Sequence, residues 1–138
     1  HIDLDIDLIK KENKENPIYY IQYSFARSQS VLERTNKVVA SNMDLSFELK
    51  NLIKKIHEWD LVALNSYKRN EVHLIAHYLE SVASIFHSLW SSAKSNPNSR
   101  FLDDDNNLTV NAQSLLKKYQ SVISEGLGIL GIKPKLKM

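Results

Sequence analysis

One run of regularly spaced apolar residues constrains the fold of this chain more than any other feature. Between residues 72 and 89 the apolar positions advance in steps of three and four, the repeat of a helix with one buried face. That face carries Val72, Ile75, Leu79, Val82, Phe86 and Leu89. Such a helix must be covered by other elements, and the whole chain holds only 3 glycines and 3 prolines to interrupt them. The sequence therefore favours long helices packed against one another.

Capping signals and the same spacing predict the other helices. Asn16 is a suitable N-cap and Pro17 suits the first helical position, so we expect a helix to start there. Asn70 and Glu71 are expected to start the long helix, and Thr109 to cap the last one. The remaining expected segments are a loose stretch over 37–44, helices over 45–57 and 61–67, and a loop over 95–107. The expected fold class is all-α, an antiparallel bundle of about five helices.

The opening segment HIDLDIDL, residues 1–8, departs from this helical pattern. Apolar residues alternate there with Asp3, Asp5 and Asp7, which predicts a short strand. The sequence offers no convincing partner strand, and a lone strand with an apolar face is not stable. Since the first residue is also not methionine, we expect the chain to be a fragment. Residues 1–15 are then the end of a preceding segment, and residues 16–138 form the helical domain.

Composition excludes several classes of function. The chain has no cysteine, which rules out disulfides, thiolate zinc sites and cysteine nucleophiles. Its formal charge of +2 and its pI of about 8.7 are compatible with an RNA partner but are common in other proteins. No apolar run has the length of a membrane span and no signal peptide is visible, so we expect a cytoplasmic protein without a membrane partner.

The motifs that resemble catalytic or metal sites are incomplete. His73 and His77 lie one turn apart, but the glutamate of the zinc-protease motif is replaced by leucine in HLIAH. The run DDDNN resembles a calcium loop, yet Leu108 and Ser114 stand where a glycine and a glutamate are required. The sequence has no glycine-rich phosphate loop and no nucleophile elbow. We expect this chain to have no catalytic residues and no metal or cofactor of its own.

The segment NPIYYIQYSFARSQSVL, residues 16–32, resembles the part of arginyl-tRNA synthetases where the catalytic core meets a helical anticodon-binding domain. That family carries Asn-Pro, an aromatic pair and then Gln-Tyr-Ala-His-Ala-Arg or a close variant. The matching positions are Gln22, Tyr23, Ala26 and Arg27. Ser24 and Phe25 replace the usual alanine and histidine, so any hydrogen bond of that histidine is not expected here.

Three further segments resemble the same family, in the same order along the chain. The alternating aspartates of residues 1–8 resemble its lead-in HxDFDxDL. HLIAHYLESVASIFHSLW, residues 73–90, resembles a family helix with Tyr-Leu, Phe-His and aromatic positions. GLGILGIKPKLKM, residues 126–138, is similar to the family's Gly-Leu-x-Leu-Leu-Gly ending and final methionine. The resemblance thus covers essentially the whole chain.

The resemblance implies an all-helical anticodon-binding domain of a class I synthetase. Its parent enzyme uses ATP, with Mg²⁺, to attach arginine to its tRNA. The HIGH-type and KMSKS-type motifs of that chemistry are absent from this sequence and would lie upstream of His1. The implied partners are arginine-accepting tRNA and an upstream catalytic domain in the same polypeptide, with the fragment itself expected to be a monomer.

The candidate RNA contacts follow from the resemblance and fit the chemistry of the residues. Anticodon loops present unstacked bases and phosphates, which proteins hold with aromatic planes, guanidinium groups and lysines. Tyr23 and Arg27 lie one helical turn apart and match family positions that contact the anticodon loop. Trp90 matches a family aromatic on the long helix, and Lys94 follows one turn later.

Two further groups of candidates lie outside the helices. The resemblance places Met138 against the anticodon bases, beside Lys133, Lys135 and Lys137. Arg100 and Phe101, adjacent in the long loop, are expected to form a cation–aromatic pair suited to a base.

Each candidate also has a purely structural interpretation. Tyr23 and Trp90 would bury their rings at the edge of the bundle, Arg27 would pair with a carboxylate such as Glu33, and the lysines near the end would be solvated. Tyr20 and Gln22 are interpreted as supporting helix packing.

Three alternative functions stay open. They are a helical protein-interaction module, a small metalloenzyme built on His73 and His77, and the corresponding domain of a cysteinyl- or methionyl-type synthetase. Convergence of Tyr23, Arg27 and Trp90 with the end of the chain, beside lysines, would disfavour the protein-interaction module.

Overall fold

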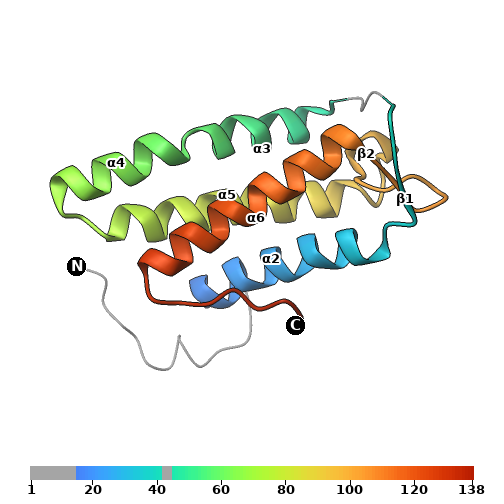
Figure 1. The fold of residues 1–138 in the computed structure, drawn as a ribbon. Coiled ribbons are helices and arrows are strands. Elements are labelled where there is room, and N and C mark those ends of the chain that lie inside the picture. The colour runs from blue at the N-terminus through green and yellow to red at the C-terminus, as the bar shows by residue number, and fades with distance from the viewer. Residues whose placement is uncertain (1–14, 42–44) are drawn as a thin grey trace.

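The computed structural model describes residues 15–41 and 45–138 (Figure 1). The strand predicted in residues 1–8 lies outside them. The described helices are α2 (Pro17–Arg34), α3 (Phe47–His57), α4 (Trp59–Arg69), α5 (His73–Ser92), the 3-10 helix η1 (Pro97–Ser99) and α6 (Val110–Ile129), and the strands are β1 (Lys37–Val39) and β2 (Asn107–Thr109). The prediction of an all-α bundle is confirmed.

The bundle is organised around α5. Along the chain, α2, the pair α3 and α4, α5 and α6 run in alternating directions (Figure 1). α5 packs against α2, α3, α4 and α6. Glu58 is both the C-cap of α3 and the N-cap of α4, so these two helices form one side of the bundle. Among the described helices, none combines the length and the apolar content that crossing a bilayer requires.

The predicted caps and the predicted apolar face are present. The Asn16 side chain accepts hydrogen bonds from the first turn of α2, and Thr109 accepts one from the first turn of α6. The predicted face of α5 is buried at Ile75, Leu79, Val82, Phe86 and Leu89. Val72 precedes the helix and is 49% exposed, so it does not belong to that face.

The start of α5 differs from the prediction, and a glycine of α6 lies against this helix. Asn70 adopts a left-handed conformation, with φ of 52°, and ends α4, so α5 begins only at His73. Gly126 lies buried inside α6. A Cβ there would come within 2.6 Å of Leu79 Cδ2, so the glycine allows α6 to approach α5 closely. Gly131, with φ of +76°, follows the helix.

A small parallel sheet joins two segments that the sequence predicts to be irregular. β1 pairs with β2 in the register Val38 to Leu108, and the Asn36 N–H donates to the Asn106 carbonyl next to it. Leu108 is fully buried. Strands of this length are too short to show an alternating pattern, which is why the sequence gives no sign of them. The pair ties the end of α2 to the loop that precedes α6.

Candidate nucleic-acid interface

Helix spacing places four polar or aromatic side chains on the contact between α2 and α5. Tyr23 and Arg27 are one turn apart on α2, and His87 and Trp90 are one turn apart on α5. Because the two helices pack against each other, the Arg27 side chain reaches both residues of α5. This contact is the centre of the candidate interface.

Arg27 is held by two hydrogen bonds and two aromatic rings. Its Nη1 lies 2.8 Å from His87 Nδ1, and its Nη2 donates to the Tyr23 hydroxyl at 3.2 Å. Its guanidinium carbon lies 4.2 Å from the centre of the Tyr23 ring and 5.0 Å from that of Trp90. Both distances are within the range of cation–π attraction. The guanidinium is therefore oriented before any ligand arrives.

His87 lies under this arrangement and is only 7% exposed. Its Nε2 is 3.0 Å from the Tyr20 carbonyl oxygen, and its ring contacts the rings of Tyr20 and Tyr23. Burial lowers the pKa of the imidazole, and the nearby positive charge of Arg27 lowers it further, against an opposing effect of the Tyr20 bond. The imidazole is thus neutral at pH 7.

The last segment, residues 132–138 and here called the tail, is attached to α2 by the buried Gln22. The Gln22 amide donates to the Lys133 carbonyl at 2.8 Å, and its carbonyl oxygen accepts from the Lys135 N–H at 2.7 Å. One side-chain amide therefore satisfies a donor and an acceptor of the tail backbone. This pairing brings the end of the tail next to Tyr23, the residue that follows Gln22, and next to Arg27, one turn beyond Tyr23.

The tail and the two helices enclose a pocket of about 450 Å³, here called the tail pocket. Its lining residues are Tyr23, Ala26, Arg27, Ser30, Glu33, Trp90, Leu136, Lys137 and Met138. It combines aromatic rings, an oriented guanidinium, an ammonium group and an exposed thioether side chain. Planar rings next to cations are the features that hold an unstacked base and its phosphate.

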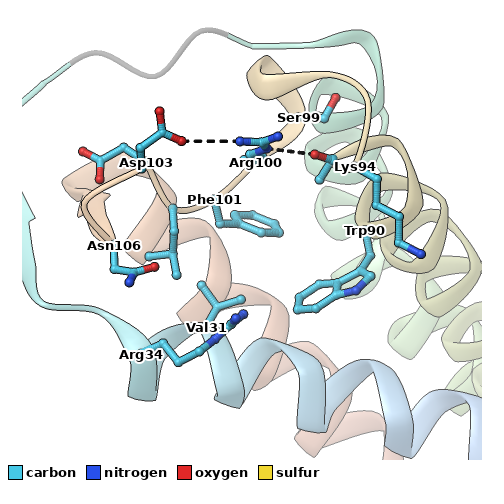
Figure 2. Close-up of a pocket in the computed structure, with 12 residues that line it drawn as sticks. Val31, Arg34, Trp90, Lys94, Ser99, Arg100, Phe101, Asp103 and Asn106 are labelled. Carbon is cyan, nitrogen blue, oxygen red and sulfur yellow. Dashed lines mark hydrogen bonds and ion pairs between the residues drawn. The ribbon is translucent and has the colours of Figure 1, made fainter.

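A second pocket of about 410 Å³, here called the loop pocket, lies beyond Trp90 and is formed with the loop after α5. Figure 2 shows the rings of Trp90 and Phe101 between Arg100 on one side and Val31 and Arg34 on the other. Lys94 also lines this pocket, as do Asp103 and Asp104. Trp90 lines both pockets and separates them.

The expected pair of Arg100 and Phe101 is not formed. Phe101 is 8% exposed and its ring stacks on Phe86, with ring centres 5.9 Å apart. Arg100 instead donates from Nε to the Ala93 carbonyl at 2.8 Å and lies 3.5 Å from an Asp104 carboxylate oxygen. The backbone at Arg100 is extended, so successive side chains point to opposite sides. Because Arg100 and Phe101 are adjacent in an extended segment, the guanidinium and the ring lie on opposite sides of the backbone.

The structure gathers half of the predicted site residues in one place. Tyr23, Arg27, Trp90, Lys137 and Met138 all line the tail pocket. The other predicted residues lie elsewhere: Lys94, Arg100 and Phe101 line the loop pocket, and Lys133 and Lys135 are exposed on the tail beside Gln22.

Sequence reasoning missed the roles of His87 and Gln22. His87 lies one turn before Trp90 on the same face of α5, and Gln22 lies on α2 directly before Tyr23. The helical spacing between His87 and Trp90 was a usable signal. The Gln22 pairing joins residues more than 100 positions apart (sequence separations of 111 and 113), and no local pattern predicts such a contact.

Two structural alternatives can be compared with the observed contacts. The recorded hydrogen bonds of Arg27 go to His87 and Tyr23, whereas Glu33 accepts from Gln29 at 3.2 Å. The His73 and His77 rings meet edge to face. Across residues 15–41 and 45–138 there is no cluster of three or more histidine, aspartate or glutamate side chains able to hold a metal ion.

The chain is similar to known proteins over most of its length. The family model of the DALR anticodon binding domain matches residues 21–138. Arginine–tRNA ligases of Roseobacter denitrificans and Jannaschia sp. are 34% and 36% identical to the chain over 99% and 96% of its length. The chain spans only 26% and 24% of the length of these relatives.

A solved structure shares the fold. A crystal structure assigned as an arginyl-tRNA synthetase of Campylobacter jejuni superimposes with a TM-score of 0.72, at 22% sequence identity. The match covers 96% of this chain and 29% of that one. The helical arrangement around α5 is therefore an arrangement known from experiment.

Proposed function

Because this chain belongs to the DALR anticodon-binding domain family, we propose that it binds the anticodon arm of arginine-accepting tRNA through the tail pocket. One observation carries this proposal: the Arg27 guanidinium is oriented over the rings of Tyr23 and Trp90, beside Lys137 and Met138. A guanidinium has five N–H donors. The recorded bonds among the described residues use one on Nη1 and one on Nη2, which leaves donors for a base edge or a phosphate.

The chemistry of the pocket supports an RNA loop over an apolar protein surface. An anticodon base needs a flat ring to stack on and a donor for its edge, and the adjacent phosphate needs a cation. In the tail pocket, Tyr23 and Trp90 supply the rings for stacking. Arg27 supplies the donor for the base edge, and Lys137 supplies the cation for the phosphate. Lys94, on the far side of Trp90, adds a positive charge beside the path of the RNA backbone where it leaves the tail pocket.

The parent protein, in this proposal, is an ATP-dependent arginine–tRNA ligase of the cytoplasm. Residues 1–15 form the end of a segment that leads from its catalytic part, and residues 16–138 form the anticodon-binding domain. The sequence has no phosphate-binding loop and no HIGH-type or KMSKS-type motif, so ATP and Mg²⁺ bind to a part of the enzyme outside this chain. The chain itself acts as a monomer that selects the tRNA and positions it for that distant site.

The test is equilibrium binding of the 138-residue chain to a labelled anticodon stem-loop of arginine tRNA. The comparison ligand is the same stem-loop with its middle anticodon base changed. We expect tighter binding of the native loop, weakening as salt is raised. Arg27→Ala should weaken binding by about tenfold or more, the cost of one charged hydrogen-bonding contact.

Lys68→Ala is the matched control, since Lys68 is an exposed cation at the end of α4 and α4 has no part in either pocket. Equal binding of the two stem-loops, together with equal loss in the Arg27 and Lys68 variants, would contradict the proposal. That outcome would mean that only the overall positive charge attracts RNA.

A further inference from the structure

We propose that His87 is a positioning residue for RNA binding: its neutral imidazole accepts a hydrogen bond from Arg27 and so holds the guanidinium in the tail pocket. Protonation of His87 releases Arg27 and weakens RNA binding. The inference rests on the proposed function for its RNA part, whereas the bond between His87 and Arg27 is testable without RNA.

The partners of the imidazole determine which nitrogen carries the proton. Arg27 can only donate, so His87 Nδ1, at 2.8 Å from Nη1, must accept. The Tyr20 carbonyl can only accept, so His87 Nε2, at 3.0 Å, must carry the hydrogen. The structure therefore admits one protonation state, the neutral imidazole with its hydrogen on Nε2.

The ring has little room to adopt another orientation. His87 is 7% exposed, and its ring centre lies 4.2 Å from that of Tyr20 and 5.6 Å from that of Tyr23. The Phe86 ring meets it edge to face at 6.3 Å. A ring flip would put Cδ2 in place of Nδ1 beside Arg27 and Cε1 in place of Nε2 beside the Tyr20 carbonyl, so both hydrogen bonds would be lost. Packing and hydrogen bonding thus select the same orientation.

Protonation is incompatible with this arrangement. A hydrogen on Nδ1 would place two donors and two positive charges 2.8 Å apart. Since the imidazole is buried and Arg27 is partly exposed, the guanidinium is the group that moves. Arg27 would then leave the rings of Tyr23 and Trp90, which it needs for its position in the pocket.

Among residues 15–41 and 45–138, no carboxylate is hydrogen-bonded to the His87 imidazole to offset this repulsion. The ionisable groups that face His87 are Tyr20, Tyr23 and Arg27 of α2, and its recorded hydrogen-bond partners among the described residues are Arg27 and the Tyr20 carbonyl. Around the adjacent tail pocket, Lys137 adds a positive charge and Glu33 a negative one. The lowered pKa of His87, due first to burial, agrees with a site built for the neutral form.

The first measurement is a nitrogen-15 NMR titration of the 138-residue chain without RNA. We expect the His87 Nε2 to carry the hydrogen, and its titration to move the Arg27 side-chain signals. In Arg27→Leu the pKa of His87 should rise, because a positive neighbour is lost. A hydrogen on Nδ1, or an unchanged His87 pKa in that variant, would overturn the inference whether or not the protein binds RNA.

The second measurement is stem-loop binding between pH 7.5 and 5.5. We expect wild-type affinity to fall as the pH drops through the His87 pKa found in the NMR titration, approaching a tenfold loss, about the size of one charged hydrogen bond, once the imidazole is protonated. The pH range is extended below 5.5 where that pKa requires it. General electrostatics predict the opposite, since the net positive charge of a protein increases as the pH falls and strengthens its attraction to RNA. Affinity that rises or stays constant as the pH passes through the His87 pKa found by NMR would overturn the inference.

Two variants separate the hydrogen bonds of His87. In His87→Asn the amide oxygen lies near the position of Nδ1 and still accepts from Arg27, but it does not titrate. We expect affinity within about threefold of wild type at pH 7.5 and no loss at pH 5.5. In His87→Gln the amide reaches toward the Tyr20 carbonyl and the acceptor for Arg27 is lost, so affinity should be about tenfold weaker at both pH values.

Thermal unfolding at each pH separates these effects from loss of the fold. A pH-dependent loss of binding that follows the unfolded fraction, or that persists in His87→Asn, would contradict a positioning role. Absence of RNA binding at every pH would contradict the proposed function and the RNA part of this inference. The bond between His87 and Arg27 would then still be decided by the NMR titration.

Discussion

The two pockets on either side of Trp90 differ in what their cations already contact. In the tail pocket, the hydrogen bonds of Arg27 go to neutral groups, an imidazole nitrogen and a phenol oxygen. In the loop pocket, Arg100 is bound to a carbonyl and lies near the Asp104 carboxylate, while Asp103 adds a second negative charge to the lining. Both linings contain carboxylates, but Glu33 of the tail pocket accepts a hydrogen bond from Gln29, whereas Asp104 of the loop pocket lies beside Arg100. An RNA phosphate would therefore compete with a carboxylate for Arg100 and with neutral groups for Arg27.

The comparison also shows which kind of sequence pattern fixes a spatial relation. Tyr23 and Arg27 are separated by four residues on one helix, and that spacing brings their side chains together. Arg100 and Phe101 are adjacent in an extended loop, and there the same reasoning fails because neighbouring side chains diverge. A cation–aromatic pair is thus predictable from helix spacing and not from adjacency in a loop.

The largest effect is expected on stability, from the buried ring of Phe101 beside the loop pocket. Phe101→Ala should lower the free energy of unfolding by about 3 kcal/mol, because the ring is buried against Phe86. RNA affinity of the folded variant should be unchanged. Urea unfolding and stem-loop binding check both statements, with the 75% exposed Phe47→Ala as control. A loss of affinity in folded Phe101→Ala would show that the loop pocket does contact RNA.

The next effect is expected from the residue that the pockets share. Trp90→Ala should weaken stem-loop binding by about 2 kcal/mol, or roughly thirtyfold, because a stacking surface and the second ring over Arg27 are both lost. Tyr67→Ala, which removes an 86% exposed ring at the end of α4, should have no effect. Fluorescence anisotropy with a labelled stem-loop measures both. An equal loss of affinity in Trp90→Ala and Tyr67→Ala would mean that the RNA binds exposed aromatic rings in general and not the tail pocket in particular.

A smaller effect is expected from releasing the tail. Gln22→Met keeps the shape of the side chain but loses both bonds to the tail, so binding should weaken by about fivefold, or about 1 kcal/mol. Hydrogen exchange at the Lys135 amide should accelerate in the same variant. Gln113→Met on α6 is the matched control. Faster exchange with unchanged affinity would mean that the tail does not need to be fixed for RNA binding.

The smallest effect is expected from a single exposed cation. Lys137→Ala should weaken binding by about twofold and reduce the slope of log affinity against log salt by about 0.7, as loss of one phosphate contact does on single-stranded RNA. Lys68→Ala should leave the slope unchanged. Binding measured at several salt concentrations gives both values. An unchanged slope in Lys137→Ala would place the phosphate contact elsewhere.

The main helices and their caps could be predicted from the sequence because they depend on local spacing. The buried face of α5, the N-cap at Asn16 and the N-cap at Thr109 all follow from patterns a few residues long. The strands β1 and β2 could not be predicted, since a three-residue strand carries no pattern and its partner lies far along the chain.

The part of the candidate site that lies on helices could be predicted from the sequence. Tyr23, Arg27 and Trp90 were found from their helical positions and from the family resemblance. The contribution of His87 depends on packing between α2 and α5, and that of Gln22 depends on where the tail runs after α6. These are tertiary relations, so they appear only in the structure.

The most direct test of the central claim is an NMR titration of the chain with the native anticodon stem-loop. It follows the Nε signals of Arg27 and Arg100 and the indole signals of Trp90 and Trp59. Trp59 is the internal reference, since its indole N–H is bound to Glu125 at 2.7 Å and its ring is buried. We predict that the signals of Arg27 and Trp90 shift with RNA while those of Arg100 and Trp59 stay constant. A shift of Arg100 with Arg27 unchanged would contradict the account, because RNA would then occupy the loop pocket instead of the tail pocket.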